Sequence, residues 1–188
     1  MTKNFKTQLT SLLKKETKQK LTKEFEQIKR RMVQEFLNHP VTREISAGSN
    51  SPNISGTLSG EGNLFSFIGF ESGVDPIAPL VLLLEETKFH YSSSSSHKMS
   101  VKYRVTLPSK EQIYRVSPMP WAMGRSWVKG IEHGISGLGF YLRKNSIGRS
   151  GGGVQIKSSR VRTGKFKNVS YISKIFKNFE RNMDGIKL

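Results

Sequence analysis

Residues 60–84 read GEGNLFSFIGFESGVDPIAPLVLLL and form the longest apolar stretch of the sequence. A polar segment rich in Gly and Ser, residues 46–63, leads into this stretch, and its turn-forming residues predict an extended loop. Leu64 to Phe70 are almost continuously apolar, which predicts a buried strand. Residues 75–86 predict a short helix, because Asp75 can cap it and Pro76 suits its first turn. We expect Leu80–Leu84 to be buried, since this segment is apolar on nearly every side.

Length and composition predict a single domain. A chain of 188 residues fits one domain, or one domain with an appended arm, and it can bury a core without disulfides or metal. The absence of cysteine excludes a disulfide framework, a thiolate zinc site and a cysteine nucleophile. No apolar run approaches the roughly 20 residues of a membrane span, and the first residues lack the apolar core of a secretory signal. We therefore expect a soluble protein with no membrane partner.

The charge of the chain indicates an anionic partner. The net charge is +17 and the isoelectric point is near 10.2, which makes nucleic acid the first candidate. The alternative interpretation of the positive charge is that the lysines lie on ordinary solvated faces of the protein. Between His133 and Phe179 the sequence has no Asp or Glu but many Lys and Arg residues. From this basic region we select four candidate contacts to DNA or to a neighbouring subunit: Arg149, Lys157, Arg160 and Arg162.

The first 40 residues predict a long basic amphipathic helix. Apolar residues recur mostly three or four apart between Asn4 and Asn38, which places them on one helical face, whereas lysines and arginines dominate the other. Such a helix could lie on a membrane or along DNA, but we favour packing against its own domain or a neighbouring subunit. Pro40 is expected to end the helix. An apolar gap from Glu16 to Lys20 indicates that the first dozen residues form a separate arm.

Residues 97–117 predict a β-hairpin. Met99, Val101, Tyr103, Val105 and Leu107 alternate with polar residues, so one face of this strand should be core and the other cationic. The cationic face supplies three further candidate contacts, Lys98, Lys102 and Arg104. A turn at residues 108–111 would return the chain as an antiparallel partner at residues 112–116. The serine run of residues 91–96 is interpreted as a mobile loop or hairpin tip.

Ser126 is expected to cap a helix with two stripes. One stripe is apolar, from Trp127 to Leu142, and the other consists of the small residues Ser126, Gly130 and Gly134. Glycine in a helix costs about 1 kcal/mol relative to alanine, so close packing of another element against the small stripe should offset that cost. Beyond this helix we expect a basic loop at residues 145–153, a strand at about 154–162 and a C-terminal helix at 171–183.

These elements predict an α+β fold in which the long N-terminal helix packs on a curved, mostly antiparallel sheet, with further short helices and a C-terminal helix. The expected organisation is a helix at residues 1–40, an extended loop at 41–63 and an α+β body at 64–188.

The sequence contains no recognisable catalytic constellation. Gly151–Gly153 belong to neither a phosphate-binding loop nor a dinucleotide fingerprint. The four histidines lack metal-ligand spacing, and Asp75 and Asp184 are the only aspartates, which disfavours a two-carboxylate site. We therefore expect a protein that is not an enzyme and binds no cofactor or metal.

Several strings of the sequence resemble a family of phage virion proteins. These are HPVTREI after the lysine-rich helix, NISGTLSGEGNLFSFIGF followed by DPI, GRSWVKGIEHGISGLGFYL, SGGGVQIK and the closing YISKIF. Together they are similar to the neck or tail-completion proteins that sit between the head connector and the tail of tailed bacteriophages. The resemblance covers about residues 30 to 183 and rests on structural strings, so it carries over no functional residue.

The resemblance implies a homo-oligomeric ring around the DNA channel. Its partners would be neighbouring connector or adaptor proteins and tail terminator or tube proteins, with non-specific contact to packaged DNA. The protein would be located in the virion, and in the host cytoplasm during assembly. Charge reversal of Arg149, Arg160 and Arg162 is then expected to weaken assembly or DNA retention. The alternative function is a basic, non-enzymatic nucleic-acid-binding protein, either ribosome-associated or DNA-packing.

Overall fold

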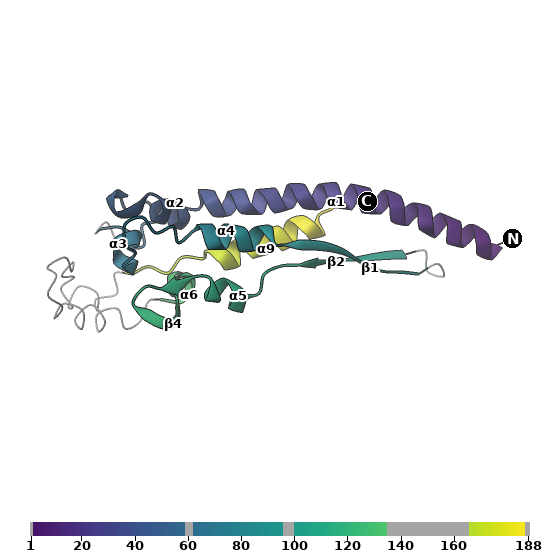
Figure 1. Ribbon diagram of the computed structural model, residues 1–188. Helices are drawn as coiled ribbons and strands as arrows, with labels where there is room; N and C mark the ends of the chain where they lie inside the picture. Colours follow the sequence, from purple (N-terminus) through teal and green to yellow (C-terminus); the bar gives the residue numbers. More distant parts are fainter. Residues whose placement is uncertain (1, 59–61, 96–99, 135–165, 187–188) are drawn as a thin grey trace.

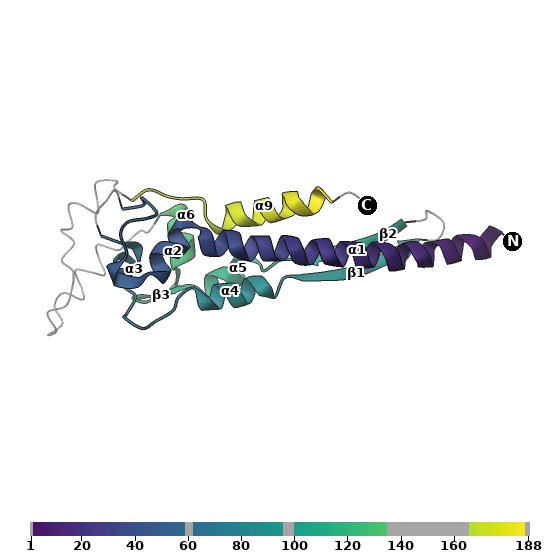
Figure 2. The same ribbon diagram turned by 90° about the horizontal axis from the view of Figure 1, so that it is seen from above.

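The computed structural model describes residues 2–58, 62–95, 100–134 and 166–186, and it has the α+β fold expected from the sequence. The molecule is elongated, and helix α1 (Thr2–Asn38) runs along most of its length (Figure 1). Three elements lie along α1: helix α4 (Ala78–Glu85), helix α9 (Ile172–Asp184) and the hairpin of β1 (Lys88–Ser95) and β2 (Ser100–Thr106). Four others gather near its C-terminal end: α2 (Pro40–Ser46), α3 (Leu64–Ile68), β4 (Ala122–Ser126) and α6 (Trp127–His133). Seen from above, α9 lies on one side of α1 and α4 on the other (Figure 2).

Helix α1 buries one stripe in its C-terminal half. Phe25, Ile28, Met32 and Phe36 recur three or four residues apart and are buried, as the periodicity predicted. Leu12 and Leu37 are exposed, so the apolar face is less continuous than expected. The helix runs unbroken through residues 16–20, so the prediction that the first dozen residues form a separate arm is wrong.

The chain turns at His39 and immediately starts a second helix. Helix α2 (Pro40–Ser46) follows α1 with Pro40 in its first turn, where the missing N–H costs nothing. The imidazole Nδ1 of His39 accepts a hydrogen bond from the backbone N–H of Val41. Pro40 therefore both ends α1, as predicted, and begins α2. A short 3₁₀ helix, η1 (Gly48–Asn50), follows in an otherwise irregular segment.

The predicted strand at residues 64–70 is wrong, because Leu64–Ile68 form helix α3. Asn63 caps this helix by accepting a hydrogen bond from the N–H of Ser66, and Gly69 ends it in the left-handed conformation, with φ of +87°. Leu64, Phe65 and Ile68 are buried as expected, whereas Ser66 is exposed. A short apolar run fits a buried helix or a buried strand equally well.

Helix α4 (Ala78–Glu85) confirms the predicted helix, which starts two residues after Pro76. Asp75 Oδ1 accepts hydrogen bonds from the N–H groups of Ile77 and Ala78. Leu80, Leu83 and Leu84 are buried, but the expectation for the whole leucine run fails at Leu82, which is exposed.

The strand predicted from Met99 to Leu107 is confirmed for residues 100–106, but its predicted partner is wrong. Strand β2 (Ser100–Thr106) pairs antiparallel with β1 (Lys88–Ser95), which includes most of the serine run predicted as a loop. Residues 110–115 form helix α5 (Lys110–Arg115) because Ser109 and Gln112 make a reciprocal capping box. In the described ranges the strands form two separate two-stranded sheets rather than one curved sheet; the second pairs β3 (Pro118–Met119) with β4 (Ala122–Ser126).

Helix α6 (Trp127–His133) starts at the predicted cap, since Ser126 Oγ accepts from the N–H of Lys129. Helix α6 ends at His133, and the next residue, Gly134, has a φ of +100°. The prediction that Gly134 continues the helix is therefore wrong. The expected elements between residues 135 and 165 lie outside the described residues. Helix α9 (Ile172–Asp184) confirms the C-terminal helix and buries Ile172, Ile175 and Phe179.

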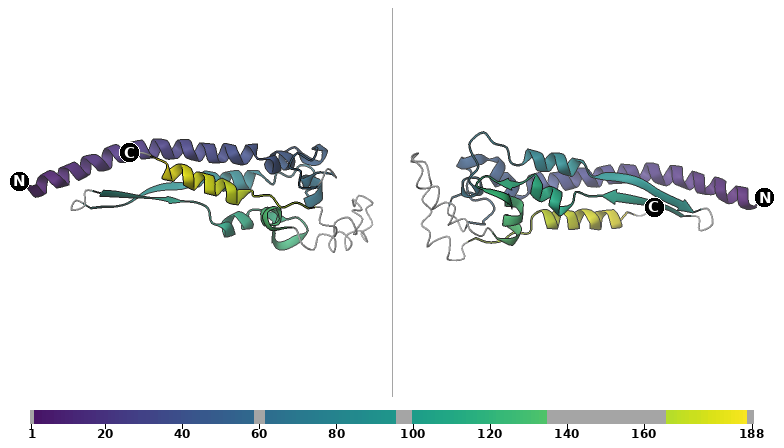
Figure 3. Two further views of the ribbon diagram at one scale, coloured as in Figure 1. Left: turned by 180° about the vertical axis from the view of Figure 1, so that it is seen from behind. Right: turned by 60° about the horizontal axis from the view of Figure 1, so that its bottom comes forward.

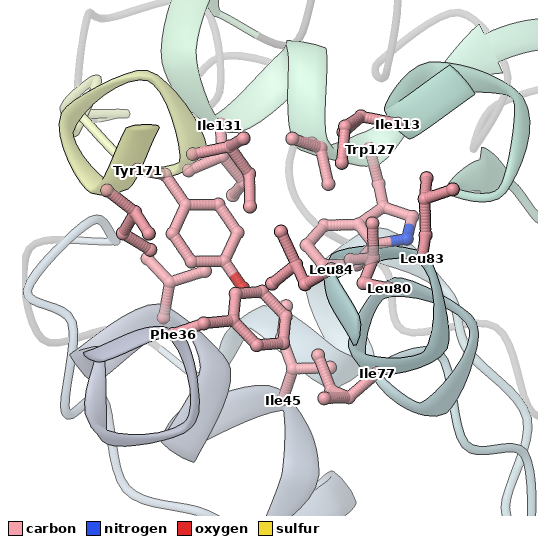
Figure 4. Packing of buried hydrophobic residues seen from close by; sticks show 14 of the residues in the cluster. Phe36, Ile45, Ile77, Leu80, Leu83, Leu84, Ile113, Trp127, Ile131 and Tyr171 are labelled. Carbon is pink, nitrogen blue, oxygen red and sulfur yellow. The ribbon is translucent and has the colours of Figure 1, made fainter. Parts of the chain in front are cut away.

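One core joins these elements. In Figure 4 the rings of Phe36 and Tyr171 lie together, with Ile131 on one side and Ile45 and Ile77 on the other; Trp127 packs beside Leu83 and Leu84. The ring centroids of Phe36 and Tyr171 are 5.7 Å apart, and those of Trp127 and Tyr171 are 6.2 Å apart. Helices α1, α2, α4, α6 and α9 therefore meet around three fully buried aromatic residues, Phe36, Trp127 and Tyr171.

Candidate interaction surfaces

The β1–β2 hairpin is attached to α1 by a ladder of aromatic rings. The ring of Phe89 stacks on that of Phe25 of α1, with centroids 5.4 Å apart, and on that of Tyr103, at 5.1 Å. The Tyr103 hydroxyl donates to the carbonyl of Lys14, and the Lys14 ammonium lies 3.9 Å from the centre of the Tyr91 ring. These contacts fix which face of the hairpin points away from α1.

That outward face is cationic. His90 and Arg104 are direct cross-strand partners, so their side chains share one face of the ladder. Lys88 and Lys102, each two residues along its strand, lie on the same face. All four side chains are exposed. Because the sequence has no Asp or Glu between Lys88 and Lys110, the strands themselves supply no carboxylate to neutralise these cations. We call this surface, residues 88, 90, 102 and 104, the hairpin cationic face.

The structure places only part of the predicted basic set. Lys102 and Arg104 lie together on the hairpin cationic face, as the alternation of the strand predicted. Sequence reasoning missed Lys88 and His90, because β1 was not recognised as a strand. Lys98, Arg149, Lys157, Arg160 and Arg162 lie outside the described residues.

The predicted small-residue stripe is divided. Ser126 and Gly130 are buried, and Ser126 Oγ shares a hydrogen bond with Ser117 Oγ at 2.7 Å. Gly134 lies past the helix end, where an added Cβ would be 3.6 Å from Asn168 Oδ1. That distance is an ordinary contact, so the positive φ, rather than lack of space, favours glycine at position 134.

Two carboxylates serve structural roles. Glu44 is fully buried, and its Oε1 and Oε2 accept hydrogen bonds from the N–H groups of Leu64 (2.7 Å) and Ser55 (2.6 Å). Glu132 Oε1 accepts hydrogen bonds from the N–H groups of Tyr171 and Ser173. These two groups lie at the start of α9, where backbone donors have no partner within the helix itself. Each carboxylate satisfies backbone donors on a segment that is distant along the chain, and so holds two segments together.

Burial shifts two titratable groups around the core. The pKa of His39 lies below its ordinary value, mainly because the ring is partly buried. A backbone hydrogen bond with Ser170 raises this pKa, the charge of Lys174 lowers it and the charge of Glu35 raises it. Burial also raises the pKa of Tyr171 far above its ordinary value, against a smaller effect of its hydrogen bond with Thr42. Tyr171 is therefore a neutral core residue.

A groove between α1, the segment after α2 and the start of α4 was not expected from the sequence. It has a volume of about 790 Å³ and is lined by Leu37, Ile45–Asn50, Phe65, Ser72–Ala78, Val81 and Leu82. Among these described lining residues, Asp75 is the only charged one. A sequence signal for the groove exists: no Lys, Arg or His occurs between Glu44 and Thr87. We call this surface the α1–α4 groove.

Within the ranges that the structure describes, no group of three or more His, Asp or Glu side chains is arranged to hold a metal ion. No described helix is long and apolar enough to cross a membrane. Comparisons with known proteins found no matching family model, no matching curated protein and no matching solved structure.

Proposed function

We propose that this chain is a structural protein of a tailed-bacteriophage virion, a neck or tail-completion component. Identical subunits would form a ring around the DNA channel and join the head connector to the tail. The proposal starts from the sequence resemblance, and the hairpin cationic face is the observation that supports it in the structure. No catalytic role is proposed.

The hairpin cationic face suits contact with DNA phosphates. Four exposed basic or titratable side chains lie on one side of a two-stranded ladder whose other side is held on α1 by stacked rings. Lys and Arg on such a surface neutralise phosphates without reading bases. A channel protein needs this kind of contact, because DNA of any sequence passes through it.

The alternative function, a free nucleic-acid-binding protein, would use the same face. The two proposals differ in assembly. A ring component forms a discrete oligomer, alone or with its connector partner, and binds DNA weakly at physiological salt. A ribosome-associated or DNA-packing protein remains a monomer or dimer and takes up nucleic acid in fixed proportion, with affinity that falls steeply as salt rises.

The test is a mass measurement combined with salt titration. The purified chain is kept at about 0.5 M salt, where phosphate contacts are weak, and its mass is followed by light scattering as salt is lowered. The ratio of absorbance at two ultraviolet wavelengths reports bound nucleic acid. A discrete ring with little bound nucleic acid supports the neck proposal. A monomer or dimer that takes up nucleic acid stoichiometrically overturns it in favour of the alternative.

The contribution of the hairpin cationic face is measured with a double variant. K102A/R104A should reduce the slope of log affinity for duplex DNA against log salt by about 2, because two phosphate contacts are lost. The matched control is R30A/R31A, which removes the same charge from exposed positions of α1. Equal effects of the two variants would mean that net charge, rather than this face, determines binding.

A further inference from the structure

We propose that the α1–α4 groove binds the N-terminal part of α1 from a second copy of this chain. This inference rests on the proposed function, since it names the surfaces through which the subunits of the ring would associate. It is argued from the exposed apolar side chains and the charges of the two surfaces.

The groove has an apolar rim that the described part of the chain leaves partly exposed. Leu37 is 37% exposed, Val74 50% and Leu82 63%. These three residues come from α1, the segment before α4 and α4, and all of them line the same hollow. Burial of the exposed parts of these apolar side chains by a partner is favourable, roughly in proportion to the apolar area removed from water. An apolar hollow with such a rim is typical of a protein-binding site.

The surroundings of the groove are acidic, in contrast to the rest of the chain. Asp75 lines it, and the exposed Glu71 lies next to its lining residue Ser72. Glu85 and Glu86 are exposed and lie three and four residues after Leu82, on the same side of α4. An acidic rim disfavours nucleic acid as the occupant and favours a basic amphipathic segment.

The N-terminal part of α1 has that chemistry. Leu12 is 56% exposed and lies on the side of α1 opposite Lys14 and Thr17, which contact the hairpin through Tyr103 and Tyr91. Lys15 and Lys18 nearby are exposed. From Met1 to Lys23 the sequence has one acidic residue, Glu16, against the following basic residues: Lys3, Lys6, Lys14, Lys15, Lys18, Lys20 and Lys23.

The two surfaces cannot meet within one molecule. Leu12 and Leu37 belong to the same helix, and 25 residues at 1.5 Å each separate them by about 38 Å. In Figure 3 the N-terminal part of α1 projects at one end of the molecule, and the segments that line the groove lie toward the other end. Binding therefore joins unlike surfaces of two copies, and such a head-to-tail contact generates a closed ring when the rotation between subunits closes.

Cysteine crosslinking tests the contact, because the natural chain contains no cysteine. L12C and L82C are prepared as separate full-length proteins, mixed and treated with a short bis-maleimide reagent. The docked pair holds the two sulfurs at millimolar effective concentration, so heterodimers should form on the order of a thousandfold faster than by collision at micromolar concentration. M123C, at a fully exposed position of β4, replaces L82C as the matched control.

Charge exchange supplies the second measurement. K15E/K18E placed in the L12C protein should reduce crosslinking to L82C, and E85K/E86K placed in the L82C protein should restore it. Circular dichroism of each variant shows that it is folded. Heterodimers that are specific for L82C and restored by charge exchange support the inference. Equal coupling of L12C to L82C and to M123C, or no restoration, overturns it.

The outcome separates this inference from the proposed function. A wild-type ring in light scattering together with unspecific crosslinking overturns this interface and leaves the ring intact. Specific crosslinking in a protein whose mass never exceeds a dimer, and which takes up nucleic acid, supports the contact and overturns the neck proposal.

Discussion

His39 connects three elements through a single neutral imidazole. Its Nδ1 accepts from the N–H of Val41 at the start of α2, and its ring lies 4.8 Å from that of Tyr171. A second hydrogen bond joins it to the backbone of Ser170. Protonation would remove the acceptor that caps α2 and place a charge beside a buried ring. The sequence could not reveal this role, because Ser170 and Tyr171 are distant along the chain.

The pH dependence of stability should report this arrangement. The folded state holds the pKa of His39 below 6.5, so between that lowered value and 6.5 the unfolded chain binds more protons. The free energy of unfolding should therefore rise with pH through this window. The contribution is fully present above about pH 6.5 and is lost as pH falls through the folded pKa. Urea unfolding at a series of pH values measures it.

H39N is the control for that measurement. Asparagine caps a helix well but does not titrate in this range, so the variant should keep most of the stability and lose this part of the pH dependence. The other histidines of the chain are the same in both proteins, and the difference between the two profiles isolates His39. Identical profiles would contradict the assignment.

Among the polar residues of the core, Glu44 should be the one whose substitution lowers the free energy of unfolding most. E44Q leaves one of the two N–H groups, of Ser55 or Leu64, facing an amide NH₂ instead of an oxygen. A buried donor left unpaired costs about 1 to 3 kcal/mol, so we expect a loss of about 2 kcal/mol in the free energy of unfolding. E71Q, at an exposed position, should change it by less than about 0.5 kcal/mol. Equal losses in the free energy of unfolding for E44Q and E71Q would contradict the stabilising role of the buried Glu44 carboxylate.

At the scale of elements, the hairpin depends on α1 for its orientation. F89A removes the ring that stacks on both Phe25 and Tyr103, and it should cost about 3 kcal/mol or somewhat less, since Phe89 is only partly buried. Y103F removes only the hydroxyl that donates to the Lys14 carbonyl, so it should cost about 1 kcal/mol. Denaturant unfolding measures the loss of stability in F89A and in Y103F. Hydrogen exchange should show that the amides of β1 and β2 lose protection in F89A. Unchanged protection would mean that the hairpin holds its position without the ladder.

The elements that could be predicted are those whose local sequence pattern fits only one type of secondary structure. The spacing of Phe25, Ile28, Met32 and Phe36 fits a helix alone, and the alternation around Tyr103 fits a strand alone. The same alternation predicted that Lys102 and Arg104 are exposed together.

The remaining elements depend on signals that are weak or distant. The serines of β1 carry no hydrophobic alternation, so pairing with β2 decides their structure. Leu64–Ile68 is too short for periodicity, and the cap at Asn63 with the turn at Gly69 decides for a helix. The α1–α4 groove is assembled from three segments of the chain, and only the missing cations between Glu44 and Thr87 indicate it in the sequence.

At the scale of the whole molecule, the stabilising contacts of α1 are concentrated away from its N-terminal end. Among the residues of α1 whose burial is described, 7–9 and 11–38, the buried ones begin at Phe25, and the contacts with the hairpin rings described above begin at Lys14. The residues before Lys14 include the exposed Leu12. This distribution separates a part of α1 that stabilises the fold from a part available to a neighbour.

Deletion of residues 2–13 tests that separation. Because the ladder and the core both lie beyond the deletion, the free energy of unfolding should change by less than about 1 kcal/mol, as for changes away from buried contacts. Self-association should be lost, since the deleted segment is the proposed occupant of the groove in the next copy. Light scattering and urea unfolding of the same preparation measure both effects. A matched full-length variant, L82K, should lose association in the same way from the other side of the contact. If the truncated chain still forms the wild-type oligomer, the subunits associate through other surfaces; if it unfolds, this part of α1 stabilises the fold.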